Sequence, residues 1–92
     1  MRIGFYATLR ALVGEKSIEL QLPGGATVRD LAHALTERYP ALAEHVFDEQ
    51  GELSRRVHFM LDGRNARWLP DGADTVIEPG QRVDVFPPAA GG

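Results

Sequence analysis

The stretch ATVRDLAHALTERYP, residues 26–40, predicts a helix whose two ends are both marked in the sequence. Thr27 stands at the N-cap position, and Asp30 three residues later gives a shortened capping box with its charge near the positive end of the helix. Pro40 ends the helix because it disfavours helical backbone angles at Tyr39. One apolar stripe at helical spacing consists of Val28, Leu31, Ala32 and Leu35. The stripe predicts that this helix packs on one further layer of structure.

Two alternating segments precede the helix. Residues 2–9 alternate between apolar and polar side chains, which predicts a half-buried strand. Residues 17–22 alternate in the same way and predict a second strand that pairs with the first as a hairpin. The sequence PGG at residues 23–25 then breaks the strand, because proline lacks a donor and glycine frees the backbone.

Further strands are predicted after the helix. Residues 56–61 read as a third strand, and Asp62–Gly63 signals a two-residue turn from which residues 64–69 return as a fourth. Residues 41–53 between the helix and these strands predict a short helical turn and a polar loop. The side chains expected to close over the core in that turn are Leu42, Val46 and Phe47.

The last strand is predicted at residues 82–86, with Val83 and Val85 on one face and Asp84 on the other. The order of a hairpin, a helix and then two or three strands predicts an α+β fold, in which a helix packs on a mixed sheet. We expect one folded domain over residues 1–86 and an extended tail over residues 87–92.

Composition excludes several classes of function. The net charge is −3 with scattered basic residues, so nucleic-acid binding has little electrostatic support. Cysteine is absent, which excludes disulfides, thiolate metal sites and a cysteine nucleophile. No apolar run approaches the roughly 18 residues of a membrane span, and no signal peptide is visible near Met1. We therefore expect a cytoplasmic protein without membrane or nucleic-acid partners.

Side chains that could carry chemistry are sparse. The histidines, twelve and thirteen residues apart, are His33, His45 and His58, and this spacing does not predict a metal site. The serines, Ser17 and Ser54, do not lie in a nucleophile elbow, and no phosphate-binding loop is present. The arginine-rich segments Arg55–Arg56 and Arg64–Trp68 are either a contact surface or an ordinary solvated face, the commoner case.

The ending FPPAAGG, residues 86–92, is the one segment arranged for chemistry. Pro87 and Pro88 end the strand and stiffen the chain, Ala89 and Ala90 add little bulk, and Gly91 and Gly92 have no Cβ. Fully extended, the six residues after Phe86 reach roughly 20 Å. Either this is a disordered terminus, where small residues gather anyway, or it delivers its last carboxylate into a narrow channel of a partner. A carboxylate is a poor acyl donor, so delivery for reaction requires an ATP-dependent partner that activates it.

Three segments of the chain resemble a known family. The segments FYATLRALVG (5–14) and ATVRDLAHAL (26–35), together with the ending VDVFPPAAGG (83–92), are similar to ubiquitin-like sulfur-carrier proteins. The resemblance is strongest to the small subunit of molybdopterin synthase (MoaD) and to the small archaeal modifier proteins, and it covers most of the chain. It implies a ubiquitin-like β-grasp fold with a mixed sheet of four to five strands, one main helix on one face, and a central last strand parallel to the first.

The resemblance also implies a function. Gly92 would be adenylated by a ubiquitin-activating-like enzyme that uses ATP and magnesium, and would then become a thiocarboxylate. The chain would be no enzyme by itself and would bind no cofactor or metal, but it would act as the small subunit of a molybdopterin synthase-like complex. Gly91 and Gly92 would enter the active sites of the activating enzyme and of the large synthase subunit. The residues expected to contact these partners are Phe86, Pro87, Pro88, Ala89, Ala90 and Gly91, with Phe86 alternatively a core residue.

The final acceptor of the sulfur stays open in the sequence. The segment EHVFDEQGELSRR, residues 44–56, is similar to the archaeal modifiers, whereas residues 62–81 resemble sulfur carriers of cysteine biosynthesis. A carrier of this kind could also serve thiamine synthesis, tRNA thiolation or conjugation to lysines of target proteins. Outside the carrier class, the sequence is compatible with a β-grasp interaction module that has an inert tail.

Overall fold

A five-stranded mixed sheet forms the framework of the protein. The computed structural model describes residues 1–88. The strands are β1 (Arg2–Phe5), β2 (Ser17–Glu19), β3 (His58–Leu61), β4 (Arg64–Asn65) and β5 (Val83–Phe86). The helical elements are α1 (Ala7–Val13), α2 (Val28–Arg38), η1 (Pro40–Leu42), α3 (Ala43–Val46), η2 (Ala66–Trp68) and η3 (Gly72–Asp74). A mixed sheet with one main helix on it confirms the predicted α+β, β-grasp fold.

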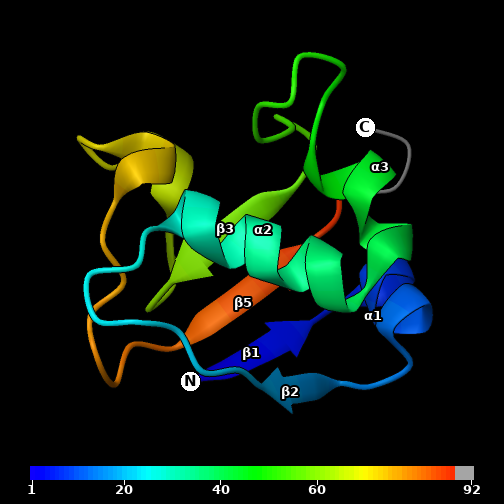
Figure 1. The fold of residues 1–92 in the computed structure, drawn as a ribbon, viewed down its shortest axis with the longest axis horizontal. Helices are drawn as coiled ribbons and strands as arrows, with labels where there is room; N and C mark the ends of the chain where they lie inside the picture. Colours follow the sequence, from blue (N-terminus) through cyan, green and yellow to red (C-terminus); the bar gives the residue numbers. More distant parts are fainter. Residues whose placement is uncertain (89–92) are drawn as a thin grey trace.

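Strand β5 occupies the centre of the sheet, whose order is β2-β1-β5-β3-β4 (Figure 1). It pairs with β1 in parallel, with Gly4 opposite Asp84, and with β3 in an antiparallel ladder in which His58 lies opposite Phe86. Strand β1 pairs with β2 on its other side in antiparallel register, as expected for the first two strands. The implied central last strand, parallel to the first, is confirmed.

Helix α2 crosses one face of the sheet (Figure 1) and has the ends that the sequence predicted. The Asp30 amide donates to Thr27 Oγ1 at 3.2 Å, and the Thr27 amide donates to Asp30 Oδ2 at 2.9 Å, which completes a reciprocal capping box. The predicted apolar stripe is fully buried: Val28, Leu31, Ala32 and Leu35 each have 0% exposure. The helix ends at Arg38, before the Tyr39–Pro40 pair.

The capping box predicts a pH-dependent stability. Hydrogen bonds from the Thr27 amide, and then from its side chain, lower the pKa of Asp30 below its ordinary value. A lowered folded-state pKa adds stability above the unfolded-state pKa, and this stability is lost as pH falls through the folded value. We therefore expect Asp30→Asn to destabilise the protein at neutral pH, with a difference from wild type that shrinks in acid.

Urea unfolding between about pH 7 and pH 2 measures this difference. Thr27→Ala removes the other half of the box and should lower the free energy of unfolding by about 1 kcal/mol at neutral pH. The control is Glu37→Gln, which removes an exposed carboxylate from the same helix. A difference between Asp30→Asn and wild type that stays constant over the whole pH range would contradict the assignment.

The predicted first strand, residues 2–9, is too long. The strand ends at Phe5, and Ala7–Val13 form the helix α1, which ends at Gly14 with a φ of 85° in the left-handed region that favours glycine. Leu9 is buried in this helix and Val13 packs against the core one turn later, so the apolar positions also fit helical spacing. Strands β1 and β2 are therefore neighbours, as in the predicted hairpin, but a helix joins them.

The other four strands are also shorter than predicted, the third as His58–Leu61 and the last as Val83–Phe86. The second predicted strand, residues 17–22, pairs only over Ser17–Glu19. The fourth, residues 64–69, is a two-residue strand that continues as η2 because the Asn65 side chain accepts a hydrogen bond from the Arg67 amide at 3.0 Å and caps the new turn. The predicted turn before it is confirmed, with φ of 50° at Asp62 and 81° at Gly63.

The elements after α2 close the core. The predicted helical turn is confirmed as η1 and α3, in which Leu42 and Val46 are buried while Phe47 packs on the core from a half-buried position. Val83 and Val85 of β5, which were predicted to share one face of the strand, are both buried. Among residues 1–88, no helix is long and apolar enough to cross a membrane.

Candidate functional site

The end of β5 is the described part of the predicted site. Strand pairing stops at Phe86, and Pro87 and Pro88 follow it as half-buried residues without assigned secondary structure. The remaining predicted site residues lie outside the described residues: Ala89, Ala90, Gly91 and Gly92. The structure therefore describes the part of the site where the tail begins, at the end of β5.

Phe86 stacks on Tyr6 at this point. The two ring centres are 4.2 Å apart and the rings are inclined by only 14°. Phe86 is half-buried and does not belong to the apolar core. Its side chain lies on the same face of β5 as Asp84, whereas Val83 and Val85 lie on the face that packs into the core. Of the two roles expected for Phe86, the core position is wrong, and contact with a partner stays a prediction. An aromatic pair at the root of the tail can present an apolar surface there.

Asp84 ties the same tyrosine to the central strand. The Tyr6 hydroxyl donates to Asp84 Oδ1 at 3.0 Å, and Arg82 Nε donates to Asp84 Oδ2 at 2.7 Å. Asp84 is 8% exposed and is the one buried charged residue found within residues 1–88. The Tyr6 hydroxyl, and then the charge of Asp84, raise the pKa of Arg82 above its ordinary value. We call Tyr6, Asp84 and Phe86 the tail anchor, since they join the start of the chain to its last strand.

Gly4 makes room for the tail anchor. It lies opposite Asp84 in the parallel ladder, and a Cβ built on Gly4 would stand 2.6 Å from Asp84 Oδ1. The Cβ of any other residue at position 4 would therefore overlap with the Asp84 carboxylate. This role of Gly4 was not predicted from the sequence, although a glycine inside an alternating strand is a recognised signal for close approach.

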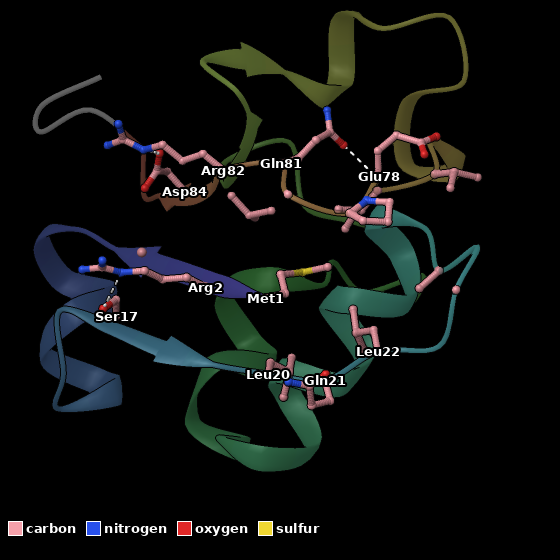
Figure 2. Close-up of a pocket in the computed structure, with 18 of the residues that line it drawn as sticks. Met1, Arg2, Ser17, Leu20, Gln21, Leu22, Glu78, Gln81, Arg82 and Asp84 are labelled. Atoms are coloured by element: carbon pink, nitrogen blue, oxygen red, sulfur yellow. Dashed lines mark hydrogen bonds and ion pairs between the residues drawn. The ribbon is translucent and has the colours of Figure 1, made fainter.

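A hollow of about 970 Å³ adjoins the tail anchor on the same side of the sheet (Figure 2). Its walls come from β1, β2, the loop after β2 and the loop before β5, and Figure 2 shows Arg2 and Arg82 extending along it. Arg2 Nε donates to the Ser17 hydroxyl at 3.2 Å, so this serine is held by a neighbour. The Ser17 hydroxyl is held by Arg2 and the Tyr6 hydroxyl by Asp84, and we describe the hollow as a contact surface beside the tail anchor.

The histidines have local contacts. His33 is exposed on α2 and stacks on Phe47 with ring centres 4.7 Å apart. His58 Nδ1 lies 3.0 Å from Asn65 Nδ2, and His45 Nε2 lies 3.8 Å from Glu44. Across residues 1–88, no group of three or more histidine or acidic side chains is placed to hold a metal ion.

Comparisons with known proteins converge on one family. The sequence model of the ThiS family matches residues 3–92. Small archaeal modifier protein 3 of Haloferax volcanii is 39% identical over 92 residues, which cover 100% of this chain and 98% of that protein. The crystal structure of SAMP1 from Haloferax volcanii superposes with a TM-score of 0.85 at 28% identity, covering 99% of this chain and 97% of the other.

A further similar structure is a putative molybdopterin converting factor, subunit 1, from Pyrococcus furiosus. It has a TM-score of 0.76 and 32% identity, and the match covers 96% of this chain and 95% of that one. The solved structures and the protein family thus agree on the fold described above.

Proposed function

Because the chain belongs to the ThiS family of small ubiquitin-like proteins, we propose that it is a sulfur carrier whose Gly92 carboxylate is converted to a thiocarboxylate. Small ubiquitin-like carriers and modifiers of this kind are not catalytic by themselves. The activation is therefore assigned to an adenylating partner enzyme that uses ATP and magnesium. Gly92 is the reacting residue of this proposal, and Gly91 gives its backbone close access to the partner.

The placement of β5 is the observation that carries the proposal. The strand is held between β1 and β3, and the tail anchor fixes its last residues before Pro87. A tail rooted in the centre of a sheet starts from a defined position and direction, which reduces the conformational entropy lost when its end enters a partner. The two prolines extend that defined lead by restricting φ.

The proposed chemistry needs only a carboxylate from this chain. A Gly92 carboxylate oxygen attacks the α-phosphorus of ATP, forming an acyl adenylate and releasing pyrophosphate. A hydrosulfide ion supplied by the partner system then attacks the carbonyl carbon and expels AMP, and loss of the sulfur-bound proton leaves the thiocarboxylate.

We propose the pterin precursor of the molybdenum cofactor as the acceptor of the sulfur. In this assignment the chain acts as the small subunit of a molybdopterin synthase-like complex, and the thiocarboxylate sulfur is transferred within the large subunit. The 32% identity to the putative molybdopterin converting factor supports it. Phe86 and the prolines after it would contact both the activating enzyme and the large subunit.

Protein modification is the second candidate function, supported by the 39% identity to a small archaeal modifier protein. The activation step is the same, but the acyl group ends on a lysine amine of a target protein and no sulfur is delivered. The two functions therefore differ only after the adenylate or thiocarboxylate has formed.

Intact-mass spectrometry tests the proposal. The chain is incubated with its activating enzyme, ATP, magnesium and a sulfur source, and we expect the mass increase of one sulfur that replaces one oxygen. The reaction without ATP is the control. Addition of the large synthase subunit and pterin precursor should return the free acid, whereas a modifier should leave Gly-Gly remnants on lysines of other proteins. A chain that stays the free acid under all these conditions would refute both functions.

A further inference from the structure

Trp68 is the most exposed large apolar side chain found in residues 1–88. It lies in η2 with 77% of its surface exposed, and it is the only tryptophan in the sequence. Helices η2 and η3, yellow to orange in Figure 1, lie at the other end of the molecule from α1. Tryptophan is enriched among the residues that dominate binding energy, so this exposed side chain is a candidate contact residue.

A hollow of about 460 Å³ lies beside Trp68. Most of its lining is apolar or small, and it shares no residue with the tail anchor. The lining consists of Val28, Leu53, Ser54, Arg55, Val57, Phe59, Asn65, Ala66, Arg67, Trp68, Gly72 and Ala73. We call this hollow, with its lining, the Trp68 surface. It can receive one apolar side chain of a partner.

The charged side chains that line the hollow are both positive. Two arginines and no acidic residue line it, and residues 55–67 contain four arginines but only Asp62 as an acid. None of these arginines takes part in an ion pair within residues 1–88. The chain as a whole carries a net charge of −3, so this region reverses the overall sign.

Three acidic residues are sequence neighbours of the lining: Glu52, Asp71 and Asp74. Asp71 takes part in no ion pair within residues 1–88, whereas Glu52 and Asp74 are both paired with Arg29. Glu52 precedes Leu53 of the lining and accepts from Arg29 at 2.6 Å, and Asp74 follows Ala73 and accepts from Arg29 at 3.2 Å. These hydrogen bonds, with Glu52 first, raise the pKa of Arg29. Because Arg29 holds both carboxylates, they do not neutralise Arg55 and Arg67, whose charges stay available to a partner.

We propose that the Trp68 surface binds an acidic peptide segment of a partner protein. One apolar side chain of that segment sits in the hollow against Trp68, and carboxylates on either side of it face Arg55 and Arg67. An exposed aromatic beside arginines combines the residue types enriched at binding hot spots, and the complementary charge gives specificity and speeds association. Nucleic acid fits less well, because one indole ring gives only one stacking platform.

Trp68 itself reports on binding, since it is the sole tryptophan. The probe is a labelled pool of short peptides that have Asp or Glu at every position except one central Leu or Phe. We expect a saturable rise in anisotropy of the label together with a blue shift of the Trp68 emission. A pool with Ser at the central position should bind at least about tenfold more weakly, because it cannot fill the hollow.

Variants locate the binding. Arg55→Glu should weaken binding of the anchored acidic pool at least about tenfold, and Trp68→Ala should do the same by anisotropy. Lys16→Glu is the matched control, because Lys16 is also an exposed cation and the charge change is identical. A chain without Gly91 and Gly92 should bind the pool normally, so a failure of the sulfur-carrier proposal would not affect this result.

Three outcomes would overturn the proposal. The first is no saturable binding of the anchored acidic pool at fixed ionic strength. The second is an equal loss of affinity in Arg55→Glu and Lys16→Glu, which would indicate unspecific electrostatic attraction. The third is tighter binding of a single-stranded RNA oligonucleotide than of the peptides, with the same dependence on Trp68, which would assign the surface to nucleic acid.

Discussion

Deleting Gly91 and Gly92 is expected to abolish thiocarboxylate formation while leaving the free energy of unfolding unchanged. The deletion moves the terminal carboxylate onto Ala90 and shortens the extended reach by about 7 Å. A misplacement of this size should lower the rate of activation by at least about a hundredfold, since even 1 Å can have that effect. The fold should persist because the buried core found in the structure ends at Val85.

An appended residue separates the carboxylate from the glycines. A chain with one alanine added after Gly92 keeps both glycines but moves the reacting group, and we expect it to stay the free acid as well. Both variants and wild type are compared by intact mass with the activating enzyme, and by urea unfolding. Conversion of the deleted chain at the wild-type rate would show that Gly92 is not the reacting residue. Conversion of the extended chain alone would show that reach, and not the position of the carboxylate, limits the reaction.

Elements with local signals were predictable from the sequence. Helix α2 was predicted because residues next to its ends mark them: Thr27 caps its start and Pro40 follows its end. Its apolar stripe fits only the helical period. The turn at Asp62–Gly63 is equally local, since both residues adopt positive φ. The first strand was predicted too long because Leu9 fits two patterns. It continues the alternation that starts at Ile3, and it also fits a helix that begins at Ala7.

Elements that depend on distant pairing were not predictable in the same way. The alternation in β5 predicted a strand with Asp84 on the face opposite Val83 and Val85, but not the parallel pairing with β1, which came from the family resemblance. The tail anchor joins residues 78 positions apart, Tyr6 and Asp84, and no periodicity in one segment carries that information. Trp68 was recognised as a possible contact residue, whereas the hollow beside it requires side chains from four separate segments.

Gly4→Ala is expected to lower the free energy of unfolding by about 1–3 kcal/mol, a large effect for the addition of one methyl group. The new Cβ would meet Asp84 Oδ1 at 2.6 Å, and the carboxylate cannot move away without breaking its bond to the Tyr6 hydroxyl. Its other bond, to Arg82, limits the remaining rotation. Gly24→Ala is the control, because nothing lies within 4 Å of a Cβ there.

A double-mutant cycle identifies the atom responsible. With Asp84→Ala in place, the contacts that remain for the Cβ of Gly4→Ala are to Tyr6 at 3.5 and 3.6 Å, which is ordinary packing distance. The same substitution should then be neutral or stabilising by up to about 1 kcal/mol, since alanine loses less backbone entropy in a strand than glycine. Urea unfolding of the four proteins should therefore give a coupling energy of at least about 1 kcal/mol. If the effects of Gly4→Ala and Asp84→Ala on the free energy of unfolding are additive, Gly4 is required for a reason other than the Asp84 carboxylate. The tail anchor would then tolerate a side chain at this position of β1.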